Sequence, residues 1–319
     1  MAMGRQAIAG FAADVGSLSS FHLMLFSLIA LTLTTGSCRQ VPAGKASATL
    51  PSNPIENIQL HTGPFAAATL DAEPGFKLRY KNRKNYRGRA KMRTGADNEH
   101  AIESIVEELN TQFSLPYDIY ICFKDCQSPD AYYDDETSQV VLCYQLIDDY
   151  YDLFSRKVRN KAKLNEAVKG AMAATFLHEL GHALMDALHL PTTGKEEDAA
   201  DQLSTLILVN NIEGGEEMAL DAARSFKLYA DQERGEEKLY WDEHSLDEQR
   251  FYDTVCMVYG YNPDKYDYLV MNGTLPRMRA NRCPEDYDKI RSSWKKLLGP
   301  YLKTVDQNLY GSLVAGWNK

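Results

Sequence analysis

Residues 168–188, VKGAMAATFLHELGHALMDAL, determine how the whole sequence is interpreted, because an apolar helical stretch contains the pentapeptide HELGH. This pentapeptide, from His178 to His182, matches the H-E-x-x-H pattern. Residues four apart lie on the same face of a helix, so both imidazoles can reach one metal ion while Glu179 stands beside it. The immediately neighbouring positions are uncharged, whereas an accidental match would be free to carry charges there. The segment therefore predicts a metal-binding helix.

A catalytic zinc site needs a third protein ligand and one open position for water. A metzincin would place a glycine at position 185 and a histidine at position 188, but this sequence has Met185 and Leu188 there. His189 comes one residue late, which turns it about 100° away on an ideal helix. The metzincin class is therefore excluded.

The downstream stretch EEDAAD, residues 196–201, offers a third ligand of the gluzincin type. Glu197 and Asp201 are four apart on one helix face, which suits a ligating glutamate and an aspartate that supports a ligand histidine. Glu196 is the competing ligand, although it has no aspartate four residues later. The alternative is an acidic helix start favoured by the helix dipole, which explains the first three acids but not Asp201.

These roles predict a zinc site in which His178, His182 and Glu197 bind Zn²⁺ and Asp201 supports a ligand. Zinc lowers the pKa of a bound water towards neutrality. Glu179 is the expected catalytic residue, since it can accept a proton from that water and later deliver it to the leaving amine.

An additional group is expected to stabilise the oxyanion, and His244 is the first candidate. It lies in the polar cluster WDEHSLDEQR, residues 241–250, at the start of a predicted helix. The same cluster can be interpreted as a capping box, in which Ser245 caps the helix and Glu248 reaches back. Three other residues are rival oxyanion donors: Tyr132, Tyr133 and Arg250.

The N-terminus is typical of a targeting segment. Residues 1–38 contain an apolar run at 21–33 and small residues before Cys38, which predicts a signal peptide and export. The stretch is similar to a bacterial lipobox but has Thr35 where leucine is usual, so Cys38 is a lipidation candidate. Export would place the protein in the periplasm, in the outer envelope or outside the cell, with contact to membranes only through such an anchor.

Composition limits the partners. The formal net charge is −9, which implies no general attraction to nucleic acid or anionic membranes. Residues 77–93 are locally basic, and we interpret them as a solvated β-ribbon or an arm before the domain, because no binding motif accompanies the charges. We expect a protein or peptide substrate and a monomeric protein.

The expected architecture is α+β and zincin-like, with a small sheet packed on a mainly helical domain. Residues 39–75 are interpreted as a flexible tether and residues 76–319 as the metallopeptidase domain. A helix at 97–113 precedes the sheet, and two of the three predicted strands should form a hairpin. The strands are predicted at 117–123, 131–133 and 139–144, and the later helices at 145–159, 164–189, 196–210, 214–231, 245–259 and 284–298.

From about Asn98 to near the C-terminus, the sequence resembles a bacterial family of exported candidate zinc metallopeptidases that is catalogued as a domain of unknown function. The resemblance implies a zinc-peptidase fold. It also implies His178, His182 and Glu197 as the zinc ligands and Glu179 as the catalytic acid/base. Gln145, where an acid is expected, and the extra Cys122 are departures. The features that carry the resemblance are Cys126, AYYD at 131–134, VLCY at 141–144, HELGH with Glu197 and Asp201, the 242–250 cluster, Cys256, Tyr259-Gly260, Arg279-Ala280, Cys283 and Trp294.

In an exported protein the cysteines are disulfide candidates, and five remain beyond the lipidation candidate. We predict disulfides Cys126–Cys143 and Cys256–Cys283, with Cys122 left as a free thiol. Pairing of Cys122 with Cys126 is the main rival. A strand would hold those two residues about 13 Å apart, which is beyond the reach of a disulfide.

The sequence therefore favours a zinc-dependent peptidase. One alternative is an inactive zinc-binding envelope domain, against which the intact general base Glu179 argues. Another is a cell-wall amidase, because the ligand set alone does not separate peptide bonds from peptidoglycan amides.

Overall fold

The computed structural model describes residues 73–81, 95–235 and 237–303, which all belong to one unit spanning Ala67–Lys319. The predicted signal peptide, the lipidation candidate Cys38 and nearly all of the predicted tether lie outside the described residues. Within them the protein is α+β, with a small mixed sheet and a mainly helical remainder. This coarse architecture agrees with the one expected from the sequence.

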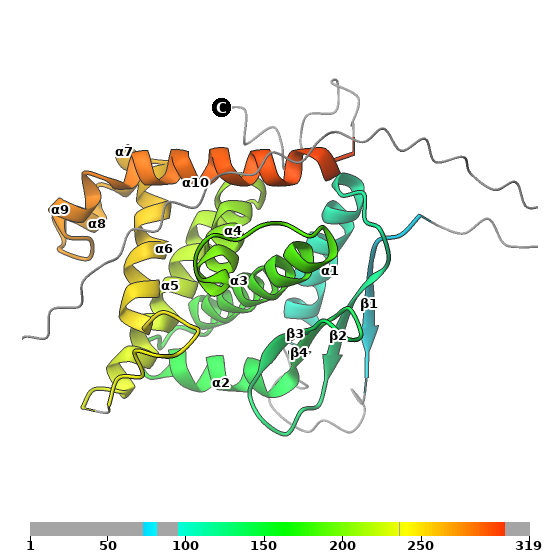
Figure 1. Ribbon diagram of the computed structural model, residues 1–319. Coiled ribbons are helices and arrows are strands. Elements are labelled where there is room, and N and C mark those ends of the chain that lie inside the picture. Colours follow the sequence, from blue (N-terminus) through cyan, green and yellow to red (C-terminus); the bar gives the residue numbers. More distant parts are fainter. Residues whose placement is uncertain (1–72, 82–94, 236, 304–319) are drawn as a thin grey trace, which may run out of the picture. The chain divides into compact units, whose positions relative to one another are not determined.

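The sheet has four strands in the spatial order β1-β2-β4-β3 (Figure 1). β2 pairs in parallel with both β1 and β4, whereas β3 pairs antiparallel with β4. The predicted hairpin is therefore confirmed, and β3 lies at an edge of the sheet. The strands are Phe76–Tyr80 (β1), Ile119–Lys124 (β2), Ala131–Asp134 (β3) and Gln139–Cys143 (β4).

The sequence pattern did not predict β1, which lies at the start of the basic segment 77–93. Successive side chains of a strand point to opposite faces. Phe76 is accordingly buried, while the exposed Arg79 places its guanidinium 3.3 Å from the centre of the Tyr120 ring. The basic segment thus begins as an edge strand of the main sheet rather than as a separate ribbon or arm. Residues 82–93 lie outside the described residues.

The seven longer helices correspond to the seven predicted ones. The largest difference is at α2, which ends four residues early, at Ser155. The next helix begins at Lys161, where Asn160 caps it by accepting a hydrogen bond from the Lys163 N–H at 3.1 Å. Short helices between α6 and α10 were not predicted. The helices are Gly95–Gln112 (α1), Tyr144–Ser155 (α2), Lys161–Ala187 (α3), Glu196–Asn211 (α4), Gly215–Gln232 (α5), Asp247–Tyr261 (α6), Pro263–Tyr266 (α7), Tyr268–Met271 (α8), Arg277–Ala280 (α9) and Cys283–Leu298 (α10), followed by the 3₁₀ turn Gly299–Tyr301 (η2). None of the helices in the described residues has the length and apolar character needed to span a membrane.

The central element is α3, which contacts α2, α4 and α5 as well as β3 and β4 (Figure 1). A helix enclosed by neighbours is apolar on most of its faces, and most residues of α3 from Ala167 onward are buried. α4 comes closest at Gly181, where an added Cβ atom would lie 3.2 Å from the Cα and 3.3 Å from the Cβ of Ala200. A larger residue at that position would push α4 away from α3.

Both predicted disulfides are present in the structure. Cys126–Cys143 connects the loop after β2 with the end of β4, and Cys256–Cys283 joins α6 to α10. Cys122 is a buried free thiol in β2 that donates a hydrogen bond to Gln139 Oε1 at 3.1 Å. Burial raises the pKa of the Cys122 thiol, despite nearby lysine and arginine charges that act in the opposite direction.

The double variant Cys256→Ser/Cys283→Ser is expected to be less stable than the parent protein. The disulfide closes a loop with a sequence separation of 27 residues, and losing such a constraint on the unfolded chain costs about 3–4 kcal/mol. Urea unfolding of the metal-free proteins measures the difference. Cys122→Ala, which removes no cross-link, is the matched control and should lose less. Equal unfolding free energies for the double variant and the parent would contradict this account.

Candidate metal centre

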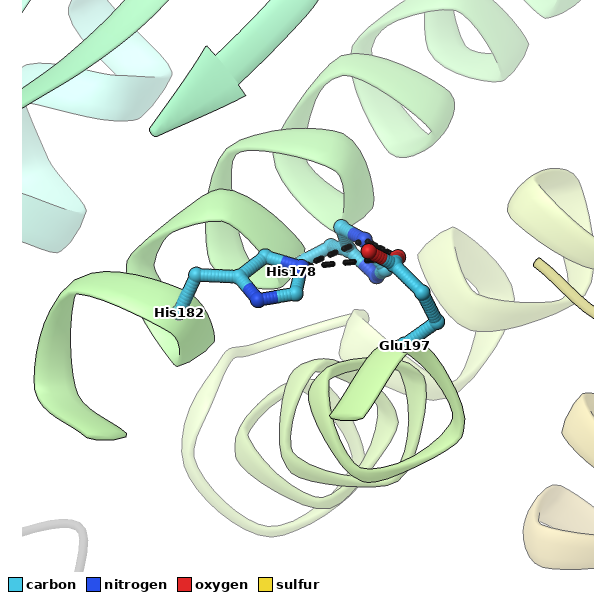
Figure 2. Close-up of side chains that lie close together, drawn as sticks. All are labelled: His178, His182 and Glu197. Atoms are coloured by element: carbon cyan, nitrogen blue, oxygen red, sulfur yellow. Dashed lines mark hydrogen bonds and ion pairs between the residues drawn. The ribbon is translucent and has the colours of Figure 1, made fainter. Parts of the chain in front are cut away.

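Three potential metal ligands converge between α3 and α4. His178 and His182 lie one turn apart on α3, and Glu197 lies in the first turn of α4. Figure 2 shows the three side chains pointing toward one another. The His178 Nε2 atom lies 3.0 Å from Glu197 Oε2 and 3.3 Å from His182 Nε2, and His182 Nε2 lies 3.4 Å from Glu197 Oε2. These residues are a group that could hold a metal ion.

The other ring nitrogen of each histidine faces a carboxylate. His178 Nδ1 lies 2.7 Å from Asp201 Oδ1, and His182 Nδ1 lies 2.8 Å from Glu196 Oε1. A neutral imidazole that donates from Nδ1 has only a lone pair at Nε2. With both rings in this tautomer, two Nε2 lone pairs and the Glu197 carboxylate face one another, and positive charge between them, from a metal ion or from a proton on an imidazole, would satisfy all three.

The spacing of the three atoms fits a tetrahedral ion. Ligands held about 2.1 Å from a tetrahedral Zn²⁺ lie about 3.4 Å from one another, close to the three distances between the His178, His182 and Glu197 atoms. The charges around His178 also favour a cation at this position. Burial alone would lower the pKa of His178, but its hydrogen bonds with Asp201 and Glu197 outweigh this and raise the pKa to about 9. The surroundings thus stabilise positive charge at this position.

Asp201 occupies the position expected for a residue that supports a ligand histidine, and it has a second partner. Arg250 donates to Asp201 through Nε at 2.7 Å and through Nη2 at 2.8 Å. The guanidinium also packs over the Phe226 ring, 4.1 Å from its centre. Burial tends to raise the pKa of Asp201, but Arg250 and His178 more than compensate and hold it well below its usual range. Asp201 is therefore an ionised acceptor for His178.

Glu196 and Glu197 have different places in this arrangement. Glu197 Oε2 lies among the ligand nitrogens, and its hydrogen bonds to the three histidines lower its pKa strongly despite burial. Glu196 contacts only the far side of the His182 ring, and its side chain is 51% exposed. The geometry therefore gives Glu197 the ligand position and leaves Glu196 as a hydrogen-bond partner of His182.

Glu179 is buried beside the ligands and lines the cavity in front of them. Burial raises the pKa of its carboxyl group, although His178 and His182 act in the opposite direction. A carboxylate with a raised pKa is a better proton acceptor than a fully solvated one. Its position and environment suit the general base predicted from the sequence.

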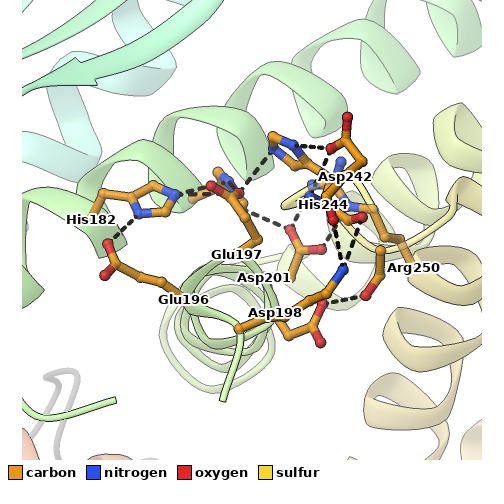
Figure 3. Close-up of polar contacts among 11 residues, drawn as sticks. His182, Glu196, Glu197, Asp198, Asp201, Asp242, His244 and Arg250 are labelled. Atoms are coloured by element: carbon orange, nitrogen blue, oxygen red, sulfur yellow. Dashed lines mark hydrogen bonds and ion pairs between the residues drawn. The ribbon is translucent and has the colours of Figure 1, made fainter. Parts of the chain in front are cut away.

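His244 reaches the centre from a different part of the chain, the segment between α5 and α6. Its Nε2 lies 2.9 Å from Glu197 Oε2, and its Nδ1 lies 3.4 Å from Asp242 Oδ1. Figure 3 shows this connection together with the Asp201–Arg250 pair. The hydrogen bond with Glu197 raises the pKa of His244, against a smaller opposing effect of burial. The structure thus brings His244 to the ligands.

The loop that carries His244 is held by the start of α4. Lys195 Nζ donates to the backbone carbonyls of Asp242 and His244 at 3.0 and 3.1 Å. The Ser245 hydroxyl donates to Asp198 Oδ1 at 2.7 Å. The alternative interpretation, a capping box formed by Ser245 and Glu248, does not agree with the structure.

Helix α6 begins one residue later than that capping box requires. Asp247 is its first residue and Leu246 stands at the N-cap position. The side chain that reaches back is Gln249, whose Oε1 accepts a hydrogen bond from the Leu246 N–H at 3.1 Å. Ser245 is left free to bind α4 instead.

Two of the rival oxyanion donors, Tyr133 and Arg250, are engaged elsewhere, whereas Tyr132 keeps its own hydroxyl hydrogen. Tyr133 donates its hydroxyl hydrogen to Asp186 at 2.8 Å, and Tyr132 accepts a hydrogen bond from Lys124 at 2.6 Å. Arg250 is committed to Asp201. Among the contacts of the described residues, His244 is the member of the four candidates that touches a proposed ligand, Glu197.

A cavity of about 660 Å³ opens in front of the three ligands. Ala131, Tyr132 and Tyr133 of the edge strand β3 form one wall, and α3, the start of α4 and the His244 loop form the rest. Among the described strands, β3 pairs only with β4, so its other edge has no strand partner there. The cavity is large enough to admit a short stretch of extended chain.

Two contributions to the site were not assigned from the sequence: Arg250 as the partner of Asp201 and Lys195 as the anchor of the His244 loop. Both act across sequence separations of 47 to 49 residues. The dense polar cluster around Arg250 was visible, but nothing in it indicated which acid it would bind.

The helix-borne histidine pair, the glutamate from the next helix and the buried Glu179 define the class of HExxH metal sites. Residues 80–298 match the DUF4344 family, described as "Putative metallopeptidase", and the chain belongs to this family. The description agrees with the resemblance seen in the sequence and implies a metal ion and a peptidase reaction. No curated protein and no solved structure gives a significant match to the chain.

Glu197→Gln is expected to weaken zinc binding more than Glu196→Gln, because only Glu197 places an oxygen among the ligand nitrogens. Asp201→Asn should weaken zinc affinity about ten- to a hundredfold by disturbing the partner of His178. Competition with a fluorescent zinc chelator measures all three affinities. A larger loss for the Glu196 variant than for the Glu197 variant would show that the ligand assignment is incorrect.

Proposed function

We propose that this protein is a zinc-dependent peptidase of the gluzincin type with a zincin-like fold. The observation that carries the proposal is the convergence of three acceptor atoms from His178, His182 and Glu197 beside the buried Glu179. Two histidines and one carboxylate are a ligand set of catalytic zinc, which keeps one position open. A purely structural zinc site is usually closed by four protein ligands and has no use for a general base.

In the proposed reaction, different residues bind the metal ion, transfer the proton and orient the His178 ring. Bound Zn²⁺ would supply a Lewis acid toward the substrate carbonyl and lower the pKa of a water molecule. Glu179 accepts a proton from the attacking water and then delivers it to the nitrogen of the leaving amine. Asp201 and Arg250 keep the His178 ring in the tautomer that leaves Nε2 free.

His244 is the proposed donor to the oxyanion that forms when the carbonyl is attacked. Its Nε2 lies next to Glu197, and Asp242 lies within 3.4 Å of its Nδ1. An imidazole that carries a hydrogen on Nε2, whether it is neutral or a cation, can donate a hydrogen bond to the negative charge that develops in the transition state. Lys195 and the Ser245–Asp198 hydrogen bond would position the loop for this role.

The proposed substrate is a protein or peptide in extended conformation. The free edge of β3 lines the outer cavity, and an extended peptide can add to such an edge by main-chain hydrogen bonds. A strand-like binding mode favours peptide bonds over the amides of peptidoglycan. The buried Glu179 disfavours an inactive zinc-binding domain.

Export and a monomeric state complete the proposal. The apolar run 21–33 motivates a signal peptide at residues 1–38, with Cys38 as the lipidation candidate. The two disulfides support an oxidising compartment such as the periplasm or cell exterior. The net charge of −9 argues against nucleic acid as a partner.

Glu179→Gln is expected to retain zinc but to lower turnover by at least about a hundredfold, since the amide cannot accept the proton from water. Casein digestion by the zinc-loaded protein measures activity, and elemental analysis measures zinc. Retained activity in this variant would exclude the proposed mechanism. Absence of activity in the parent protein on any peptide would exclude the proposed function.

His244→Gln should lower kcat while zinc affinity stays within about threefold of the parent. The reason is that oxyanion donors contribute about a hundredfold or more to kcat, whereas the three proposed ligands remain intact. Steady-state kinetics on one peptide and the chelator competition assay give the two values. A large loss of zinc affinity would instead make His244 a fourth ligand.

A further inference from the structure

A second, smaller cavity of about 240 Å³ adjoins the outer one. The two cavities share Ala131, His178, Glu179 and His244 as lining residues, so they meet at the proposed point of cleavage. The inner cavity extends from there between α3, α5 and the start of α6. A side chain next to the scissile bond could enter it while the backbone stays in the outer cavity.

Small residues leave room for that side chain. The lining includes Ala171 and Ala174 of α3 and Ala219 and Ala222 of α5, which are buried or nearly so. Larger residues at these positions would fill the space between the helices. The cavity is therefore built into the packing of α3 against α5.

Five of the hydroxyl groups that line the inner cavity offer acceptors rather than donors. Each of these five already donates its hydrogen to a protein oxygen, so its remaining lone pairs are available to a ligand. Tyr150 and Thr175 form one hydrogen bond at 2.7 Å, and the remaining donations are Thr175 to Ala171 O, Ser204 to Ala174 O, Ser225 to Ala222 O and Tyr229 to Asp149.

The charged groups of the inner cavity also favour a cation. Arg250 is engaged by Asp201 through two of its nitrogens and packs over Phe226. Asp247 lines the same cavity, and the positive charges of Arg250 and Lys238 act on its carboxylate, although neither forms an ion pair or a hydrogen bond with it among the residues that the structure describes. Burial raises the pKa of Asp247 to about 6, so it is mostly ionised at neutral pH. Asp247 also acts electrostatically on Tyr150 and Tyr229, consistent with its place beside them.

The outer cavity carries an excess of acid as well. Besides the proposed ligands and Glu179, its charged lining residues are Lys195, Asp135, Asp186, Glu196 and Glu243. The single lysine is bound to two backbone carbonyls. Four acids and one engaged lysine make the approach to the metal centre electrostatically attractive to cations.

We infer that the inner cavity binds a lysine or arginine side chain adjacent to the scissile bond, so that the substrates are basic peptides. The inference rests on the proposed peptidase function. A long cationic side chain supplies the donors that the hydroxyl lone pairs and the Asp247 carboxylate lack. An acidic side chain would face acceptors and a carboxylate, and an apolar one would leave that carboxylate without water or a partner.

Digestion of a random peptide library by the zinc-loaded protein, with the products identified by mass spectrometry, tests the inference. The expected result is enrichment of lysine and arginine at one position flanking the cleaved bond. Enrichment of acidic or apolar residues there, or no preference, would overturn the inference and leave the peptidase function intact. Cleavage of no peptide would overturn the peptidase function and the inference with it.

Asp247→Asn provides the second test, with kcat/KM measured on two peptides that differ only by lysine or glutamine at the selected position. The preference for lysine should fall by about tenfold, as expected for losing one partner of a partly buried charge pair. Asp247→Glu should restore it. Asp264→Asn, an exposed carboxylate on α7 at the far end of α6, should leave it unchanged. Unchanged lysine preference in an Asp247→Asn protein that retains zinc would also overturn the inference.

Discussion

The close approach of α3 and α4 at Gly181 is the constraint on which the metal centre depends. Ala200 lies against Gly181, and Glu197 and Asp201 lie three residues before and one residue after it on α4. One helix contact thus places both the proposed third ligand, Glu197, and the partner of His178, Asp201. A side chain at position 181 would push α4 away from α3, and it would displace both carboxylates in the same direction because α4 carries both. The glycine between the two histidines is therefore as much a part of the site as the histidines themselves.

Acidic and basic side chains alternate in the site from the cavity to the interior. Glu197 and Glu179 line the cavity. His178 contacts Glu197 through Nε2 and Asp201 through Nδ1, and Asp201 in turn accepts a hydrogen bond from Arg250. Burying an unpaired Asp201 would cost several kcal/mol (~3–5 kcal/mol for a broken buried pair), so Arg250 is what permits an ionised acceptor behind the ligand. The ionised form matters because it fixes the hydrogen on Nδ1 and leaves the Nε2 lone pair for the metal.

The parts of this arrangement that follow from local periodicity could be predicted from the sequence. His178, Glu179 and His182 share one helix, and Glu197 and Asp201 share the next, so spacing alone indicated their faces. Arg250, Lys195 and strand β1 could not be assigned, because each depends on a partner distant in the chain. The helix start at Asp247 was misplaced for a related reason. Ser245 is a favourable cap by local rules, but its hydroxyl is taken by Asp198 of another helix. Tertiary contacts override local preference at these positions.

The inner cavity and the metal centre share structural residues, and this limits how substrate preference can vary in such a site. Asp201 and Arg250 line the cavity and also hold His178, so changing either would alter the proposed metal site together with the lining of the cavity. Glu179 lines both cavities and is the proposed general base. Asp247, Ala219 and Ala222 line the cavity without contacting a ligand residue through any hydrogen bond or ion pair among the described residues. Charge and size at these three positions can therefore change the side chain that is accepted while the ligands and their supports stay in place.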